Sequence, residues 1–410
     1  MSSTRFAAKS ILTFWVSLSV FLFSALALSV SSGYTYGPAL LLLPALGYLF
    51  VRSYPAFHSG DKLVLSALLI YFSAGVLTNI VHHMSSRDYD NFSRFLLAIP
   101  VLFLLMRFPV KPVYFWSGIA IGALGAAVVA YLDFYVHGES RAGGYNNPIQ
   151  FGDIAMLFAC LLLAGFSWAK QHSKWMSLIF FLGIVAGVFA SLLSGARGGW
   201  LALPFAIGVF FIANGFYKNK KHTWLFVVAL SCLAVAFYSS RESSFLQERI
   251  QDALSDLHEY TQAKNANTSI GIRFTLWQHG LDLVVQRPLL GWGSVENYVA
   301  ITGDSSAVFK QFSHFHNELL DAFVKRGLLG VCALLALYVL PALAFFRLLK
   351  QTATNANSAA AWAGLMLVLA TFLFGLTQSF FCHASGVMIY IFMLVIVWTQ
   401  ARLVVAKEQD

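Results

Sequence analysis

Long runs without a charged side chain dominate the hydrophobic pattern of this chain. No Asp, Glu, Lys or Arg occurs between Ser10 and Val51, or between Gln351 and Ala401. Each run is long enough for two membrane spans of about 20 residues. Spans of this length satisfy their backbone hydrogen bonds within a helix. The pattern predicts about twelve transmembrane helices, at 11–31, 38–52, 62–82, 93–107, 112–135, 150–169, 175–194, 198–217, 222–240, 328–349, 358–381 and 385–405.

Composition supports the same fold class, an all-α polytopic membrane protein. Hydrophobic types make up 58% of the 410 residues and charged types only 11%, which is too little charge for a soluble protein of this size. The first apolar run also resembles a secretory signal peptide. Because it exceeds the usual signal core of about 7–15 residues, we interpret it as a retained first helix. The four cysteines lack metal-ligand spacing and are expected to be buried apolar residues.

The distribution of basic residues predicts the orientation. Most Lys and Arg residues of the short loops fall on the side that holds both termini, and the opposite short loops hold only Arg87, Arg94, Arg141 and Arg197. The positive-inside rule therefore places both termini in the cytoplasm. The net charge of +9 is explained by anchoring to anionic membrane lipid, so it does not imply a nucleic-acid partner.

Charge is concentrated in one long segment between the predicted spans. We divide the chain into helices one to nine (1–240), a large outer loop that forms the catalytic region (241–326) and helices ten to twelve (327–410). Apolar periodicity predicts a short helix over 271–286 within this loop. A second short helix is expected to begin near His316 and to break at Arg326-Gly327.

Few charges fall inside the predicted spans. Asp133, Asp153 and Arg197 lie near span ends on the outer side. An ion-coupled transporter usually places charged groups near the middle of the membrane. The pattern favours chemistry at the outer face, and transport remains the lesser alternative.

Three arginines are candidates for binding an anion. Arg197 lies in a Ser-Gly-Ala-Arg-Gly-Gly turn, where glycines allow a ligand to approach closely, although an interfacial arginine would explain it too. Arg273 lies at the start of a helix, where a cation opposes the helix dipole, and a surface salt bridge is the alternative. Arg141 precedes Asn147, for which capping and sugar binding are both open.

Two histidines carry the candidate acid–base chemistry. His314 and His316 stand where a short helix begins, and a helix N-terminus favours a neutral imidazole that can accept a proton. The spacing also suits a metal, but a third ligand at matching spacing is missing. Asp88-Tyr89-Asp90 could hold a divalent cation, but the neighbouring Arg87 and Arg94 favour a solvated surface. We therefore predict neither a metal nor a cofactor.

The order of these motifs resembles a known family. After the Ser-Gly-Ala-Arg-Gly turn come Gly271-Ile272-Arg273 with Trp277, and then Pro288-Leu-Leu-Gly-Trp-Gly293; these are followed by His316-Asn-Glu-Leu-Leu320 and Arg326-Gly-Leu-Leu-Gly330. This pattern, over roughly residues 185–345, resembles the bacterial O-antigen ligase/polymerase superfamily, and the ligases most closely.

The resemblance implies an inverting, metal-independent glycosyltransferase of the GT-C type in the bacterial inner membrane, with its site facing the periplasm. Its partners would be an undecaprenyl-diphosphate-linked glycan as donor, lipid A–core as acceptor and membrane lipid. His316 would activate the acceptor, and Arg197 and Arg273 would handle the diphosphate, whereas Arg141 has no clear counterpart in the family. An O-antigen polymerase and a protein O-oligosaccharyltransferase remain open as alternatives.

Overall fold

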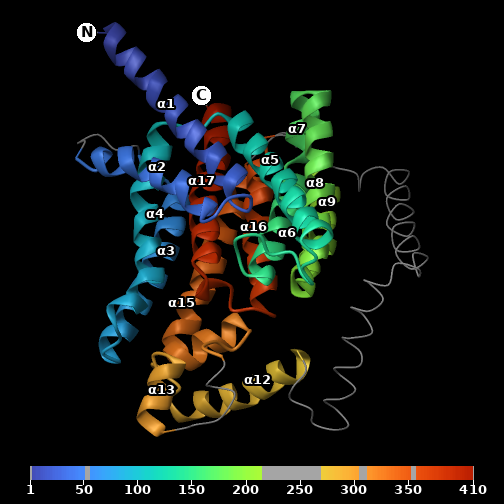
Figure 1. The fold of residues 1–410 in the computed structure, drawn as a ribbon. Coiled ribbons are helices and arrows are strands. Elements are labelled where there is room, and N and C mark those ends of the chain that lie inside the picture. The colour runs from blue at the N-terminus through green and yellow to red at the C-terminus, as the bar shows by residue number, and fades with distance from the viewer. Residues whose placement is uncertain (1, 51–55, 215–268, 304–311, 352–356, 410) are drawn as a thin grey trace.

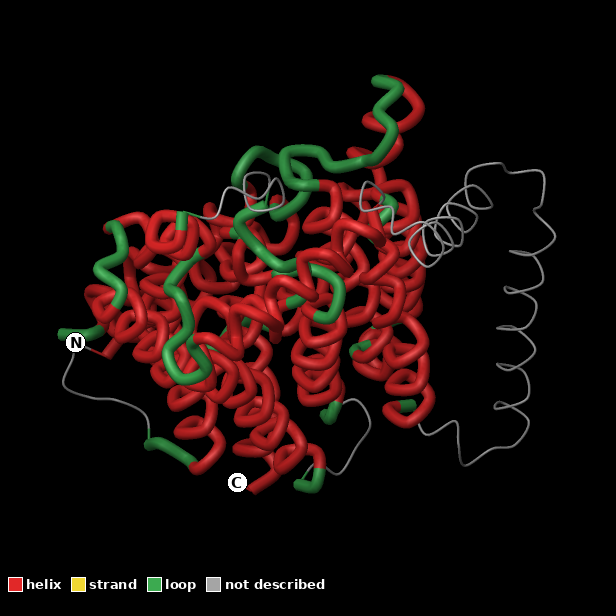
Figure 2. Tube along the Cα trace, turned by 90° about the horizontal axis from the view of Figure 1, so that it is seen from below, coloured by secondary structure: helices red, strands yellow, loops and turns green. Residues whose placement is uncertain are grey.

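A computed structural model describes residues 2–50, 56–214, 269–303, 312–351 and 357–409. The described part contains helices and no strand (Figures 1 and 2). The α-helices are α1 (Ser2–Leu26), α2 (Gly33–Tyr48), α3 (Ser59–Val81), α4 (Asp90–Arg107), α5 (Pro112–Tyr131), α6 (Pro148–Ala164), α7 (Phe166–His172), α8 (Lys174–Ser194), α9 (Ala202–Ala213), α12 (Ser269–Gln286), α13 (Val295–Thr302), α15 (Glu318–Leu349), α16 (Ala359–Gly375) and α17 (Ala384–Gln409). Shorter turns of 3-10 or π helix are η1 (Ser86–Tyr89), η2 (Leu132–Val136), η3 (Arg197–Leu201) and η5 (Phe380–Cys382).

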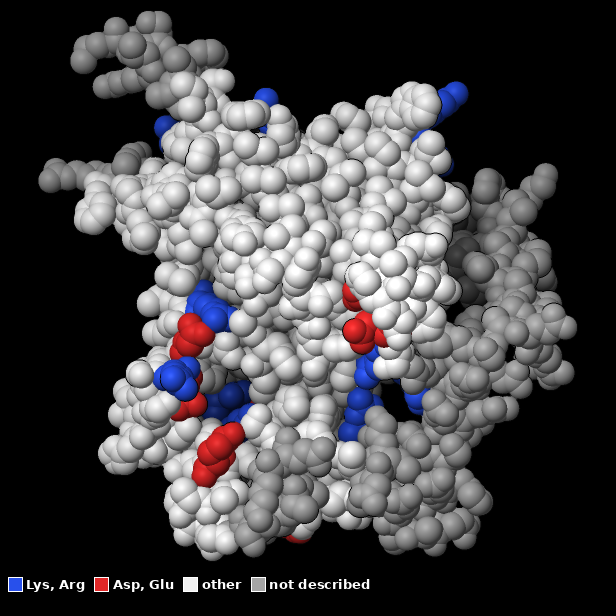
Figure 3. All heavy atoms as spheres, in the orientation of Figure 1, with Lys and Arg blue, Asp and Glu red and all other residues white. Residues whose placement is uncertain are grey.

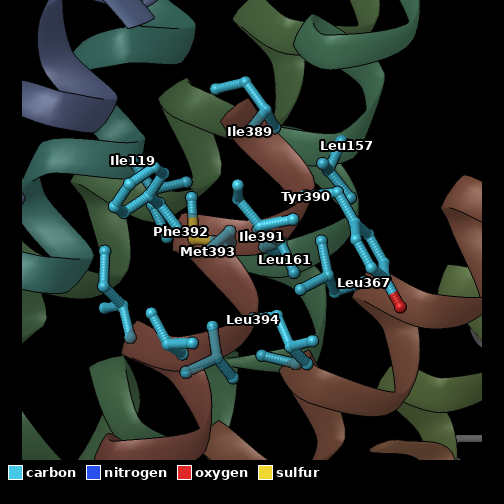
Figure 4. Close-up of a cluster of buried hydrophobic side chains, with 14 of the residues drawn as sticks. Ile119, Leu157, Leu161, Leu367, Ile389, Tyr390, Ile391, Phe392, Met393 and Leu394 are labelled. Carbon is cyan, nitrogen blue, oxygen red and sulfur yellow. The ribbon is translucent and has the colours of Figure 1, made fainter. Parts of the chain in front are cut away.

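The central helix of the bundle is α17. Every side chain from Val387 to Ala401 is buried, as expected of a helix that is apolar on all sides. Figure 4 shows Ile119 of α5, Leu157 and Leu161 of α6 and Leu367 of α16 around the α17 segment Ile389–Leu394. The buried Tyr390 hydroxyl donates to the Leu337 carbonyl of α15 at 2.8 Å. The core is thus built around α17, whose buried stretch is apolar apart from Ser385, Thr399 and Gln400.

The outer surface of the bundle is apolar, as a lipid-facing surface requires. Large hydrophobic side chains such as Leu77, Val128 and Phe181 are exposed on it. In Figure 3 a broad band without charged atoms separates a few Lys and Arg atoms at the upper edge from charged groups in the lower half. This apolar surface surrounds several helices that are long enough to cross a membrane, as in a multi-pass membrane protein.

The described helices differ in whether they are long enough to cross a membrane. Among the described residues, six helices are long and apolar enough to cross a membrane, and a seventh span arises if the bent pair α6 and α7 is taken as one. The predicted span 222–240 lies outside the described residues, and each other predicted span overlaps a helix. The prediction of helices is confirmed, and the count of twelve remains a prediction.

The two termini lie at one end of the bundle, and α12 and α13 lie beyond the opposite end (Figure 1). The helix predicted over 271–286 is confirmed as α12. The helix α13 was not predicted; its start at Ser294, whose hydroxyl accepts from the Asn297 amide at 3.0 Å, is an ordinary capping signal. Of the proposed outer loop, residues 241–268 and 304–311 lie outside the described residues.

Two glycine motifs join the α12–α13 connection to α15. The break predicted at Arg326-Gly327 is a kink within α15, where Gly327 has φ 60°. The kink exposes the carbonyls of Val324 and Lys325, which accept from the amides of Trp292 and Gly293 at 2.9 and 2.8 Å. In exchange, the amides of Leu328 and Leu329 donate to the carbonyls of Pro288 and Leu289.

This exchange explains why both motifs are rich in glycine. A Cβ on Gly327 would stand 2.3 Å from the Leu289 carbonyl carbon, and one on Gly291 would stand 2.5 Å from the Val324 oxygen. Only glycine allows the two backbones to approach this closely. The pairing fixes the end of α12 and the start of α13 against the charged first turns of α15.

Candidate functional site

The turn that carries Arg197 is held on two sides. Gly195, at φ 66°, ends α8, and the Ser194 carbonyl before it accepts from Nε of Arg141 at 2.7 Å. A Cβ on Gly198 would lie 1.7 Å from Oγ1 of Thr377, and one on Gly199 would lie 2.5 Å from Oδ1 of Asp153. Glycine is therefore required here for close packing, and the turn brings Arg141 and Arg197 together with the first turns of α6.

Asp153 is the acidic group at this place. It is 1% exposed, and neither carboxylate oxygen accepts a hydrogen bond from the described residues. Burial disfavours the ionised form of this carboxyl group, and the positive charges of Arg273 and Arg141 favour it. A buried carboxylate is tolerated only when cations compensate its charge. Asp153 therefore belongs to the arginine cluster, which we define as Arg141, Arg197, Arg273 and Asp153.

Arg273 reaches this cluster from α12. Burial lowers the pKa of its guanidinium, the positive charge of Arg197 lowers that pKa further, and the charge of Asp153 opposes both effects. Two guanidinium groups are thus held close enough to repel each other. Like charges that the fold forces together are typical of a place where an ion of opposite charge binds.

The face of α12 that carries Arg273 also docks on the segment before α15. Nε1 of Trp277 donates to the Phe315 carbonyl at 2.9 Å. A Cβ on Gly280 would stand 3.0 Å from both Leu320 and Phe315, so the helix packs closely there. Arg273, Trp277 and Gly280 are spaced four and three residues apart, so they share one face of α12, which extends from the arginine cluster to the histidines.

His316 is held in a conformation that is unusual for a residue other than glycine. Its φ is 49°, in the left-handed region. The Phe315 amide before it donates to Asp321 at 3.2 Å, and Asn317 after it caps α15 by accepting from the Leu320 amide at 3.0 Å. These bonds hold the backbone on both sides, so the fold maintains the strain at His316.

The imidazole of His316 is kept neutral mainly by burial. Burial lowers its pKa most, the hydrogen bond with Gln378 opposes this, and the charge of Arg273 lowers the pKa further. His316 lies one residue before Asn317, which caps α15, so it is next to the N-terminus of that helix but outside it. Arg273 lies one turn inside α12 and not at its start.

Two other histidines, His314 and His383, lie close to His316. The His314 ring centroid lies 4.3 Å from that of His316 and 5.8 Å from that of His383. Burial is the main cause that lowers the pKa of His314 to about 4. Burial is also the main cause that lowers the pKa of His383. Nδ1 of His314 is buried without a hydrogen-bond partner in the described part of the chain. Within that part, no three His, Cys, Asp or Glu side chains are arranged as ligands of one metal ion.

A second charged group, the α15 cluster, consists of Glu318, Asp321, Lys325 and Arg326. Asp321 and Lys325 form a salt bridge of 2.9 Å, and Glu318 accepts from the Phe381 amide at 2.9 Å. Arg326 lies over the rings of Tyr71 and Phe92. The four residues line a cavity of about 250 Å³.

The Asp88-Tyr89-Asp90 triplet borders the α15 cluster. Asp88 lines the same cavity and accepts from the Ser85 hydroxyl at 2.7 Å, whereas Asp90 pairs with Arg94. The two carboxylates are thus engaged with separate partners.

The structure gathers most of the predicted site residues at the end of the bundle where α12 lies. These are Arg141, Arg197, Arg273, His314 and His316. Asn147 caps α6 by accepting from the Ile149 amide at 2.9 Å, with Pro148 in the first helical position. A substrate role for Asn147 remains a prediction.

Sequence reasoning missed Asp153, Gln378 and His383. Asp153 had been noted only as a charge near a span end. Gln378 and His383 lie in the polar break Thr-Gln-Ser-Phe-Phe-Cys-His between the last two apolar helices. That break was the available signal, but nothing in the sequence indicated that it meets His316.

The fold and the site define a class: a polytopic helical membrane protein with clustered arginines and a neutral imidazole at one end of the bundle. A family model described as O-antigen ligase matches residues 182–335, the part that contributes Arg197, Arg273 and His316. An uncharacterized protein of Haemophilus influenzae is 30% identical over 92% of this chain and 96% of its own length.

Two relatives with assigned names match shorter parts. An O-antigen ligase of Escherichia coli is 23% identical over 66% of each chain. A general O-oligosaccharyltransferase of Acinetobacter baylyi is 26% identical over 52% of this chain and 37% of its own length. The chain belongs to the O-antigen ligase superfamily, whose members are glycosyltransferase-type ligases, and this supports its assignment as a transferase.

Proposed function

We propose that this chain is an O-antigen ligase that transfers a glycan from undecaprenyl diphosphate to a sugar of lipid A–core at the periplasmic face of the inner membrane. The observation that carries the proposal is the position of Arg273. Its charge interacts with Arg197 and Asp153 in the arginine cluster and also lowers the pKa of His316. The guanidinium of Arg273 thus interacts electrostatically both with the arginine cluster and with the neutral base His316.

The arginine cluster suits the leaving group of such a donor. A diphosphate on the anomeric carbon leaves with a negative charge that grows as the carbon–oxygen bond breaks. Guanidinium groups bind phosphate oxygens in a bidentate way and stay charged at physiological pH. Positive groups aimed at the developing charge stabilise the transition state more than the ground state. In this proposal Arg197, Arg273 and Arg141 do so without a metal ion.

His316 supplies the complementary step. The acceptor hydroxyl oxygen forms a bond to the anomeric carbon, the bond from that carbon to the diphosphate breaks on the opposite face, and the configuration inverts. The hydroxyl proton passes to a ring nitrogen of His316, which must be neutral to receive it. General-base catalysis of this kind contributes about 10²- to 10⁴-fold in rate.

A protein acceptor is the second candidate, because the relative from Acinetobacter baylyi is named a general O-oligosaccharyltransferase. Such an enzyme would share the donor and the base and would differ in the acceptor. An O-antigen polymerase differs in the same respect, since its acceptor is a second lipid-linked glycan.

The test is reconstitution of the purified chain with an undecaprenyl-diphosphate glycan and each acceptor separately: lipid A–core, a serine-containing peptide and a second lipid-linked glycan. We expect lipid A–core alone to gain the mass of the glycan. His316→Ala should abolish this transfer, while His172→Ala, an exposed histidine of α7, should leave it intact. Transfer to the peptide or to the second glycan alone would replace the ligase with the corresponding alternative. No transfer at all would remove the proposal.

A further inference from the structure

His316 is the first of three polar side chains that contact one another in series. Nδ1 of His316 lies 2.8 Å from Oε1 of Gln378, and Nε2 of Gln378 lies 3.1 Å from Nε2 of His383. Gln378 is 1% exposed, so its side-chain amide is shielded from solvent. All three residues come from segments that join helices at the end of the bundle where α12 lies.

The backbone holds this chain of side chains in register. The backbone N–H of Gln378 donates to the Phe374 carbonyl at 3.0 Å, which continues the last turn of α16. Beside it, Nδ2 of Asn317 donates to the Leu376 carbonyl at 3.2 Å. Asn317 is thus hydrogen-bonded to the segment that carries Gln378. This contact and the backbone bond of Gln378 to α16 fix the distance between the His316 imidazole and the Gln378 side-chain amide.

The two ends of an amide have opposite hydrogen-bonding roles. The carbonyl oxygen only accepts and the NH₂ group only donates. With Oε1 towards His316, the imidazole must donate from Nδ1, so its proton sits there and Nε2 keeps a lone pair. With the NH₂ group towards His383, Nε2 of that ring must accept.

From this arrangement we infer that Gln378 is a positioning residue that holds His316 in the tautomer with a free Nε2, and that His383, by accepting from the Gln378 NH₂ group, helps to keep the amide in this direction. The inference rests on the proposed function, in which Nε2 receives the acceptor proton. Turning the amide by half a turn would place the proton of His316 on Nε2 and leave no base there. The activity of a histidine base depends strongly on its tautomer, since the wrong tautomer can lower kcat by several orders of magnitude.

Charged and titratable groups from several elements face His316 and enter any pH profile. They are His314 from its own segment, Arg273 from α12, Asp321 from α15, and His383 from the segment before α17. Substitutions at Gln378 leave all of these in place. A change in the profile of a Gln378 variant therefore reports the loss of the bonds that this amide makes to His316 and His383.

The kinetic test compares Gln378→Leu with Gln378→Glu. The leucine variant removes the acceptor for Nδ1–H, and we expect kcat to fall by about 10²-fold with the KM for donor unchanged. The glutamate variant keeps an acceptor, and its carboxylate favours protonated imidazole. We expect it to retain most of the kcat at pH 8 and to move the acidic limb of the profile to higher pH.

A matched control is Gln400→Leu. Gln400 is also a buried glutamine, 5% exposed, and donates to the Val110 carbonyl at 2.9 Å near the opposite end of the bundle. This variant should keep the wild-type kcat and pH profile. Wild-type kinetics in Gln378→Leu, or an equal loss of kcat in Gln378→Leu and Gln378→Glu, would overturn the inference.

A measurement that does not depend on transfer is the tautomer itself. In protein labelled with ¹⁵N-histidine, two-bond proton–nitrogen correlation spectra distinguish the two tautomers, and the His316 signals are those missing from His316→Gln. We expect the proton on Nδ1 in the wild type and a mixture of tautomers in His383→Ala. A proton on Nε2 in the wild type would overturn the inference. Absence of glycan transfer would instead remove only the proposed function.

Discussion

The arginine cluster and the α15 cluster lie at the same end of the bundle but combine charges in opposite ways. In the α15 cluster, Asp321 and Lys325 are in direct contact at 2.9 Å. In the arginine cluster, Arg197 and Arg273 are close enough that one lowers the pKa of the other. Opposite charges in contact serve the fold, whereas like charges brought together cost folding free energy that a bound anion can offset.

The first prediction concerns folding and has the largest expected effect. Asp321→Asn removes one partner of a buried ion pair, which costs about 3–5 kcal/mol because the remaining charge stays buried and unpaired. We expect a clear drop in the unfolding temperature in detergent. The double variant Asp321→Leu with Lys325→Met should recover most of it. Equal stability of Asp321→Asn and the wild type would show that the α15 cluster is not structural.

The arginine cluster should behave in the reverse way. Arg273→Gln removes a cation proposed to act on the leaving group, and we expect transfer to fall by about 10²- to 10³-fold. Its unfolding temperature should fall less than that of Asp321→Asn, because the loss of repulsion with Arg197 offsets part of the attraction to Asp153 that is lost with it. Arg107→Gln, an exposed arginine at the last position of α4, should change neither quantity. A large loss of stability in Arg273→Gln would make the two clusters alike.

Anion binding separates the clusters directly. A ligand that binds only the folded state stabilises it by about 2.7 kcal/mol at 100 times its Kd. We expect inorganic pyrophosphate to raise the unfolding temperature of the wild type and of Arg107→Gln, but not of a variant with both Arg197→Gln and Arg273→Gln. The same rise in that double variant would place the anion elsewhere.

The smallest expected effect is the dependence of stability on pH. The pKa of His314 is lowered to about 4 in the folded state, against about 6.5 in an unfolded chain. Between these values the unfolded chain binds more protons, so stability falls as the pH drops from 7 towards 4. Chemical denaturation at pH 7 and pH 5 should show this loss, and His314→Gln should reduce it. An unchanged loss in that variant would assign it to other groups.

Activity should fall over the same pH range for a related reason. The pKa of His316 is also lowered, so the imidazole stays neutral to a lower pH than an ordinary histidine. We expect kcat to be flat above pH 7 and to decline only below the usual histidine value of about 6.5. A decline that begins well above pH 7 would contradict a depressed pKa at the base.

The sequence by itself determined the class of protein and much of its local structure. Uncharged apolar runs have to be buried or face lipid whatever the fold, so Ser10–Val51 and Gln351–Ala401 predicted membrane helices from composition alone. Short-range signals did the same for α12, for the cap at Asn147 and for the break at Gly327, because each depends on neighbours within a few residues. The arginines and His316 were identified as residue types in the right segments.

Only the tertiary structure decided what these residues touch. Asp153 and Arg273 are far apart in the chain, as are His316 and Gln378, and no periodicity encodes their meeting. The packing of α12 on α15, the backbone exchange at Gly327 and the position of α16 bring them together. Burial, the first cause that lowers the pKa of His316, is a property of that packing, so it could not be predicted from the residues next to His316 in the sequence.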